Sequence, residues 1–123
     1  CGRTESGAPM DEFSISGMTD AAEWKDGELA TFTLDPVDLG FAKCGDAEVS
    51  VAGARESARI IRAILCGEDR GPRRWIIELN AAATLRVAGC SDGWPEVLAL
   101  ARGAIDSGAA WRKLEEVRSA LSR

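Results

Sequence analysis

The sequence contains no histidine among its 123 residues. Histidine is the commonest general base, the usual partner of a nucleophilic serine or cysteine, and a frequent metal ligand. Its absence excludes Ser-His and Cys-His catalytic pairs and imidazole metal sites. Any chemistry of this chain must therefore use carboxylates, arginine, lysine, serine or backbone amides.

Closely spaced cysteines and long apolar runs are also lacking. No two of the four cysteines form a C-x-x-C pair, which argues against a thiolate zinc site or a disulfide framework and favours reduced cysteines in a cytoplasmic protein. No stretch approaches the roughly 20 apolar residues of a membrane span. The chain begins at Cys1 and no secretory signal pattern follows, so we expect no targeting peptide.

The sequence is acidic, with 15 Lys and Arg against 20 Asp and Glu and a net charge of -5. A net negative charge argues against general binding to nucleic acid or to anionic membranes. Residues 1–50 hold 11 acidic and 3 basic residues, whereas residues 51–123 hold 9 acidic and 12 basic residues. The pattern of apolar residues changes at the same point, so we predict a loop and β-hairpin part over 1–50 and a helical part over 51–123.

Turn-forming and strand-like segments dominate residues 1–50. Residues 20–24 and 29–34 flank the sequence Lys-Asp-Gly-Glu at 25–28. An Asp-Gly pair accepts the positive φ angles of a type I′ turn, so we predict a β-hairpin here. Pro36 should end the second strand, because proline has no amide hydrogen to donate, and a loop should follow.

Helical periodicity dominates the remainder of the chain. It predicts four helices: over residues 54–66, over 72–89, from near 95, and from 107 to the C-terminus. Ile60 and Ile64 lie on the apolar face of the first helix, Pro72 begins the second, and Ser107 should cap the fourth. The sequence therefore predicts an α/β chain, in which a β-hairpin with edge strands precedes about four packed helices.

Two adjacent carboxylates, Asp11 and Glu12, are the first candidate for chemistry. They lie in a segment with glycine and proline, where a bent, extended backbone would let both face one hard cation. Magnesium is typically held by one or two carboxylates together with substrate phosphates. The pair is therefore a candidate Mg²⁺ site, although an acidic pair on a solvated loop is the more frequent arrangement.

Arginines and one asparagine are the remaining candidates. An arginine patch would suit phosphate oxygens, and the alternative is a solvated helix face with local acidic partners. The arginines are Arg55, Arg59, Arg62, Arg70, Arg73 and Arg74. Asn80 lies within an apolar helix, so we expect a buried polar side chain bonded to a neighbouring loop.

Five segments occur in the order typical of the anthranilate phosphoribosyltransferase family. Residues 10–17 (MDEFSISG) resemble that family's Asp-Glu segment, and residues 33–40 (TLDPVDLG) resemble the segment that follows its hairpin. Three helical segments complete the resemblance: residues 56–74, 79–89 and 101–115. Together they extend over nearly the whole chain, which therefore resembles the C-terminal portion of this family.

The resemblance implies a large α/β domain of which residues 1–123 form the C-terminal segment. It implies transfer of the phosphoribosyl group from phosphoribosyl pyrophosphate to anthranilate, with release of pyrophosphate, in the second step of tryptophan biosynthesis from chorismate. By match to the family motif, Asp11 and Glu12 would bind Mg²⁺, and no catalytic residue is assigned. The family's N-terminal helical domain and glycine-rich pyrophosphate loop have no counterpart in this sequence, so we expect the chain alone to be inactive.

The expected partners follow from the same resemblance: both substrates and the missing N-terminal half, with a homodimer left open in the complete enzyme. One alternative is a non-catalytic relative of the same fold that binds nucleic acid through its arginines, and another is a structural or interaction module. Because strands of the missing half would be absent, we also expect the apolar faces around Ile60 and Ile64, and around residues 79–83, to be unburied.

Overall fold

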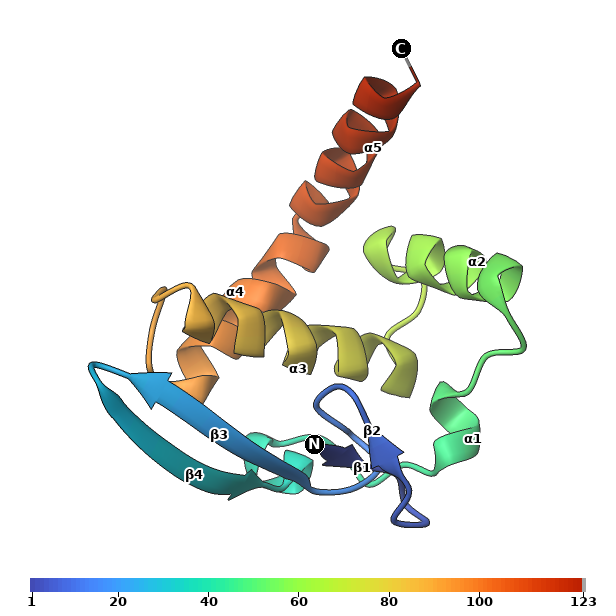
Figure 1. Ribbon diagram of the computed structural model, residues 1–123. Helices are drawn as coiled ribbons and strands as arrows, with labels where there is room; N and C mark the ends of the chain where they lie inside the picture. Colours follow the sequence, from blue (N-terminus) through green and yellow to red (C-terminus); the bar gives the residue numbers. More distant parts are fainter. Residues whose placement is uncertain (123) are drawn as a thin grey trace. The chain divides into compact units, whose positions relative to one another are not determined.

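The computed structural model describes residues 1–122. It divides the chain into two compact units, a first unit, Cys1–Ser50, and a second unit, Val51–Arg123. The division falls at the point where the charge balance of the sequence changes. Strands precede helices along the chain (Figure 1), and the α/β class predicted from the sequence is confirmed.

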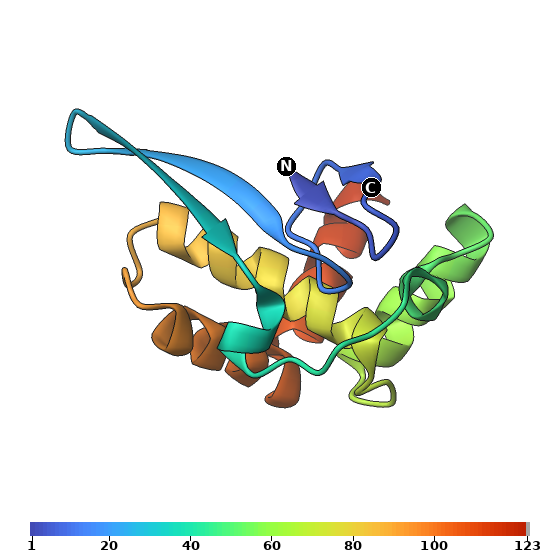
Figure 2. The same ribbon diagram turned by 90° about the horizontal axis from the view of Figure 1, so that it is seen from below.

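The first unit is built on an antiparallel sheet with strand order β2-β1-β3-β4. Its strands are β1 (Gly2–Arg3), β2 (Pro9–Met10), β3 (Thr19–Lys25) and β4 (Glu28–Leu34). The β3–β4 hairpin is long and twisted and extends well beyond the two short strands (Figure 2). The predicted hairpin is confirmed, and the sheet is completed by β1 as an inner strand and β2 as an edge strand.

The hairpin turn has the predicted backbone conformation. Asp26 has φ 53° and Gly27 has φ 84°, the positive values that a type I′ turn requires at both central positions. The register runs from Lys25 opposite Glu28 down to Thr19 opposite Leu34. Thr19 and Leu34 are buried, so the hairpin is anchored at its base.

Two short helices follow the hairpin where the sequence predicted only a loop. They are η1 (Pro36–Leu39) and α1 (Asp46–Val49). In η1, the Asp35 carboxylate accepts a hydrogen bond from the amide of Val37 at 2.9 Å, which caps this single turn of helix.

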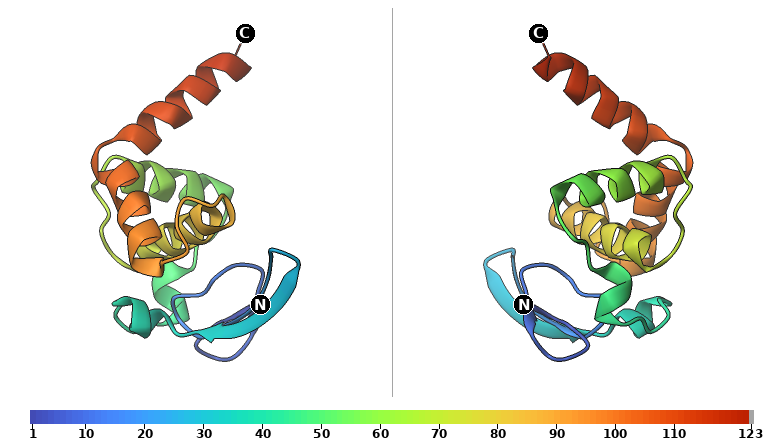
Figure 3. Two further views of the ribbon diagram at one scale, coloured as in Figure 1. Left: turned by 90° about the vertical axis from the view of Figure 1, so that its left-hand side faces the viewer. Right: turned by 90° about the vertical axis from the view of Figure 1, so that its right-hand side faces the viewer.

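Four helices make up the described part of the second unit. They are α2 (Ala54–Leu65), α3 (Pro72–Val87), α4 (Trp94–Asp106) and α5 (Ala109–Leu121). Helix α3 packs along α4, and α2 contacts α3, α4 and α5; Figure 3 shows α5 leading away from the other three. Within residues 1–122, no helix combines the length and apolarity needed to cross a lipid bilayer.

The apolar faces of α2 and α3 are buried, so the expectation that they would be exposed was wrong. Ile60 and Ile64 are 6% and 0% exposed and form a cluster with Ile105 of α4. Leu79 and Ala82 of α3 are both 0% exposed. Helix α4 contributes Ile105 to the first cluster and packs along α3, so helices of this chain contribute to the burial that was expected from missing strands.

The start of α5 differs from the prediction in one detail. Gly108, not Ser107, is its N-cap residue, although the Ser107 hydroxyl accepts a long hydrogen bond from the amide of Ala109, the first residue of α5, at 3.4 Å. Ser107 instead closes α4, where its amide donates to the carbonyl oxygen of Gly103 at 3.0 Å. The left-handed conformation of Gly108, with φ 71°, separates the two helices.

Candidate functional site

Asp11 and Glu12 lie in the loop that joins β2 to β3, and both side chains are exposed. Met10, the residue before the pair, is held opposite Gly2 in the β1–β2 ladder. Beyond the pair, the amide of Ser14 donates to the hydroxyl of Thr19 at 3.0 Å, inside the first unit. The loop that carries the acidic pair is therefore fixed at both ends.

Two glycines allow β1 to contact this loop closely. A Cβ atom on Gly2 would lie 2.1 Å from the carbonyl oxygen of Glu12, and a Cβ atom on Gly17 would lie 2.4 Å from the carbonyl oxygen of Arg3. Any side chain at either position would force β1 and the loop apart. No motif in the sequence pointed to these glycines, although a glycine in a strand often marks such a close approach.

Ser14 orders the backbone that follows the acidic pair. Its side chain is fully buried, and its hydroxyl oxygen accepts hydrogen bonds from the amides of Ser16 and Gly17, both at 3.1 Å. These bonds satisfy backbone donors in a turn that has no ladder partner for them. The segment resembling the family's Asp-Glu motif thus contains its own structural support.

The electrostatics of the pair suit a cation. Partial burial, together with the negative charge of Asp11, raises the pKa of Glu12 above its ordinary value. Within residues 1–122, neither carboxylate is bonded to an arginine or lysine, and no group of three or more metal-binding side chains is present. Two adjacent carboxylates without a protein cation form the open oxygen-donor set that Mg²⁺ accepts.

The arginine candidates have different environments. Arg74 is 5% exposed, and its guanidinium pairs with Glu78 at 2.5 Å and with Asp106 at 2.9 Å. Glu78 also accepts from Arg102 at 2.9 Å, which joins α3 to α4 through charged groups. The guanidinium of Arg62 lies 5.4 Å from the ring centre of Trp111. Arg74 therefore serves helix packing and cannot belong to a surface patch.

Asn80 makes a hydrogen bond within its own helix. Its side-chain amide donates to the carbonyl oxygen of Ile76, one turn earlier in α3, at 2.9 Å, and the side chain is half-buried. The helix therefore supplies this acceptor from its own backbone.

The cysteines are all free thiols. Cys44 is buried, and its thiol donates to the carbonyl oxygen of Ile15 at 3.4 Å. Burial, followed by the charges of Glu48 and Asp46, raises the pKa of Cys44. The other three cysteines are exposed, so only Cys44 among the four packs inside its unit.

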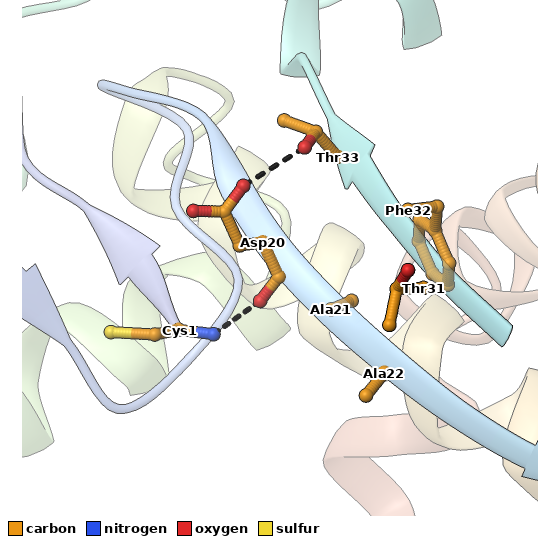
Figure 4. A pocket seen from close by; sticks show the side chains of 7 residues that line it. All are labelled: Cys1, Asp20, Ala21, Ala22, Thr31, Phe32 and Thr33. Atoms are coloured by element: carbon orange, nitrogen blue, oxygen red, sulfur yellow. Dashed lines mark hydrogen bonds between the residues drawn. The ribbon is translucent and has the colours of Figure 1, made fainter. Parts of the chain in front are cut away.

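An open hollow lies along the β3–β4 hairpin, away from the acidic pair in sequence. Its lining residues are Cys1, Asp20, Ala21, Ala22, Thr31, Phe32 and Thr33. Figure 4 shows the Asp20 carboxylate facing Thr33, whose hydroxyl donates to it at 2.9 Å, and Arg3 also pairs with Asp20 at 3.1 Å. The one carboxylate of the hollow therefore already has partners, and Cys1 contributes an exposed thiol to its lining.

Comparison with protein families gives a match over residues 4–111, to the α/β domain of the glycosyl transferase family. That match extends over most of the chain. The chain belongs to this family. The matched residues include the acidic pair and all of helices α1–α4, so the glycosyl transferase domain contains both the candidate site and the scaffold described above.

Curated relatives of this glycosyl transferase chain are named anthranilate phosphoribosyltransferase. The protein from Clostridium beijerinckii is 42% identical over 110 residues, which cover 89% of this chain and 32% of the relative. The protein from Anaeromyxobacter dehalogenans is 39% identical over 116 residues, which cover 94% and 34%. The chain thus spans about a third of the length of the curated relatives it matches.

Solved structures agree in fold. An anthranilate phosphoribosyltransferase from Saccharomyces cerevisiae in complex with 4-fluoroanthranilate has a TM-score of 0.84 and 29% identity, covering 92% of this chain and 33% of the yeast chain. A variant of the yeast enzyme with magnesium bound has a TM-score of 0.78 and 30% identity, covering 86% and 31%. Magnesium is therefore found with a structure similar to this chain.

Proposed function

We propose that this chain is the C-terminal segment of the α/β domain of an anthranilate phosphoribosyltransferase. The complete protein would transfer the phosphoribosyl group of phosphoribosyl pyrophosphate to anthranilate and release pyrophosphate, in the cytoplasm, as a step of tryptophan biosynthesis. The names of the relatives support this proposal. The nucleic-acid-binding alternative loses Arg74, which is buried among helices, and no relative or structure reported above is named for nucleic-acid binding.

Within that reaction, Asp11 and Glu12 would hold a Mg²⁺ ion. The observation that carries this assignment is the pair of adjacent, exposed carboxylates that has no cationic partner within residues 1–122. When bound, Mg²⁺ supplies Lewis-acid stabilisation of the negative charge that develops on the leaving pyrophosphate. Without a cation between them, the two carboxylates would repel that anion.

The rest of the first unit would fix the position of these two side chains. Gly2 lets β1 lie against the backbone of Glu12, and Ser14 orders the turn that follows. Preorganised ligands contribute to catalysis because they need no rearrangement at the moment of reaction. The groups that bind the pyrophosphate and anthranilate themselves would come from the remaining two thirds of the protein.

A chimera tests the proposal directly. Residues 4–111 of this chain would replace the matching segment of the Clostridium beijerinckii relative, and conversion of phosphoribosyl pyrophosphate and anthranilate would be measured. We expect an active chimera, in which Asp11→Asn combined with Glu12→Gln lowers kcat/KM by roughly 100-fold, about 3 kcal/mol of transition-state stabilisation. Raising the Mg²⁺ concentration should partly restore the rate.

The matched control removes one Asp and one Glu charge elsewhere in the first unit, with Asp38→Asn combined with Glu28→Gln. This control should keep near-normal kcat/KM. Equal losses in both double variants would indicate a general charge effect, and normal activity of the Asp11/Glu12 variant across a Mg²⁺ titration would reject the metal assignment. The isolated 123-residue chain should show no turnover.

A further inference from the structure

We propose that Asp46 is a positioning residue for the acidic pair. This inference rests on the proposed metal role of Asp11 and Glu12. Asp46 lies more than thirty residues further along the chain, and its carboxylate bonds both to the turn that precedes the pair and to the segment that follows it.

Three hydrogen bonds carry the proposal. The Oδ1 atom of Asp46 accepts from the backbone amide of Glu5 at 2.8 Å and from the hydroxyl of Ser16 at 2.8 Å. Its Oδ2 atom accepts a longer bond from the hydroxyl of Ser6 at 3.4 Å. Both short bonds reach the same oxygen, so the Glu5 amide and the Ser16 hydroxyl are held next to each other.

These contacts enclose the loop that carries the acidic pair. Glu5 and Ser6 lie in the turn between β1 and β2, which is closed by a bond from the amide of Thr4 to the carbonyl oxygen of Ala8 at 2.8 Å. The acidic pair follows directly after β2, and Ser16 follows the pair. Asp46 therefore joins the two sides of the segment from which Asp11 and Glu12 project.

Asp46 is itself well anchored. It is the first residue of α1, and its carbonyl oxygen accepts from the amide of Ser50 at 3.1 Å and from the hydroxyl of Ser50 at 2.7 Å. The preceding Gly45 donates its amide to the Glu48 carboxylate at 2.8 Å. Because the backbone on both sides of Asp46 is fixed, its carboxylate can restrain the turn that contains Glu5 and the segment that contains Ser16.

The charge of Asp46 persists at neutral pH. The bond from the Glu5 amide, followed by the bond from the Ser16 hydroxyl, lowers the pKa of Asp46. An ionised carboxylate accepts from several donors at once, and such charge-assisted bonds are stronger than neutral ones. Residues that orient metal ligands typically change metal affinity by about 10–100-fold when they are altered.

The first test needs no metal. Amide hydrogen exchange of the 123-residue chain would be compared among the natural sequence, Asp46→Ala, Asp46→Asn and Asp38→Ala. Asp46→Ala should speed exchange at Glu5 and across residues 12–17, because it removes the shared acceptor. Asp46→Asn keeps an oxygen at Oδ1 and should exchange more slowly than Asp46→Ala, and Asp38→Ala controls for the loss of one charge.

The second test uses Mn²⁺ as a paramagnetic probe in place of Mg²⁺. Broadening of the amide signals of residues 10–17 during a Mn²⁺ titration reports binding at the acidic pair. Asp46→Ala should raise the apparent Kd by about tenfold, whereas Asp46→Asn and Asp38→Ala should raise it by less than about threefold. A purely structural role would lower the melting temperature of Asp46→Ala and leave the Kd of the folded molecules unchanged.

The outcomes separate the two proposals. If the natural chain binds Mn²⁺ at residues 10–17 and Asp46→Ala binds it equally well, the positioning role is wrong and the metal role stands. If the natural chain shows no local broadening, or if Asp11→Asn combined with Glu12→Gln leaves it unchanged, the metal role is wrong and the positioning role is lost with it. Unchanged exchange in Asp46→Ala also overturns the positioning role.

Discussion

The two units of this chain are stabilised in different ways. Apart from Pro36, the first unit buries four apolar residues: Ile15, Leu34, Phe41 and Cys44. The second buries twice as many, contributed by three helices. In the first unit, backbone contacts at two glycines and hydrogen bonds from short polar side chains replace much of that apolar packing. The candidate site therefore belongs to the unit whose shape depends on individual backbone contacts.

The largest effect should come from adding a single methyl group to the first unit. In Gly17→Ala, the new Cβ would lie 2.4 Å from the carbonyl oxygen of Arg3 and 2.8 Å from that of Thr4. The Arg3 oxygen belongs to β1, and the Thr4 oxygen accepts from the amide of Gly7 at 2.9 Å, so both would have to shift and we expect about 3 kcal/mol of destabilisation or more. Amide hydrogen exchange should show lost protection across residues 1–20.

Gly103→Ala is the matched control in the second unit. Gly103 lies inside α4, and no atom lies within 4 Å of the position that its Cβ would occupy. Alanine is the better helix former, so this change should stabilise the protein by about 0.5–1 kcal/mol. If both glycine substitutions change the melting temperature equally, the contrast between the units is wrong.

The charged contacts of the second unit should give the next largest effect. Glu78→Ala removes the carboxylate that pairs with Arg74 and Arg102, and leaves Arg74 buried with Asp106 as its remaining acidic partner. Removing one member of a buried pair typically costs about 3 kcal/mol. Urea unfolding would measure this loss. A loss of less than roughly 0.5 kcal/mol in the free energy of unfolding would contradict this prediction, because water would then replace the ion pair without loss of stability.

Acid should weaken the first unit through Asp20 and Asp46. Hydrogen bonds lower the pKa of both carboxyls, from Thr33 and Arg3 for Asp20 and from Glu5 and Ser16 for Asp46. Their contribution to stability is complete above the ordinary carboxyl pKa and is lost as the pH falls through the lowered value. Hydrogen exchange at the Glu5 amide, corrected for intrinsic rates, should speed up below about pH 4. Asp46→Asn should show a flatter dependence on pH.

The smallest effect should be a gain in stability at the acidic pair. The pKa of Glu12 is raised by burial and by the charge of Asp11, so its ionised form at neutral pH opposes folding. Without metal, Glu12→Gln should therefore increase the free energy of unfolding by roughly a few tenths of a kcal/mol after solvent screening. Its melting temperature should rise accordingly. With excess Mg²⁺, the natural sequence should have the higher melting temperature of the two proteins. A lower melting temperature of Glu12→Gln without metal would contradict this account.

Local sequence signals predicted the regular elements well. The Asp-Gly pair fixed the hairpin turn, and Pro72 and the apolar periodicity located the helices, because these signals act within a few residues. Strands β1 and β2 have two residues each, which is too short for any periodicity, and they form only because they pair with other segments. The burial of Ile60 and Ile64 depends likewise on a partner helix more than forty residues away.

The candidate site was predictable only in its ligands. Asp11 and Glu12 were found through their adjacency and through the family motif. The residues that support them were not found, since Gly2 matters through its distance to the Glu12 carbonyl oxygen and Asp46 through its bonds to Glu5 and Ser16. Such contacts depend on the folded path of the chain and leave no spacing pattern in the sequence.

The rate at which the Cys44 thiol can be modified reports local opening of the first unit. Its thiol is buried against the carbonyl oxygen of Ile15, and its raised pKa keeps the reactive thiolate scarce, whereas Cys66 and Cys90 are exposed. A thiol reagent should therefore modify the exposed cysteines at once and Cys44 only during moments when the segment around Ile15 opens. The rate of that slow modification would measure how often the loop beside the acidic pair opens.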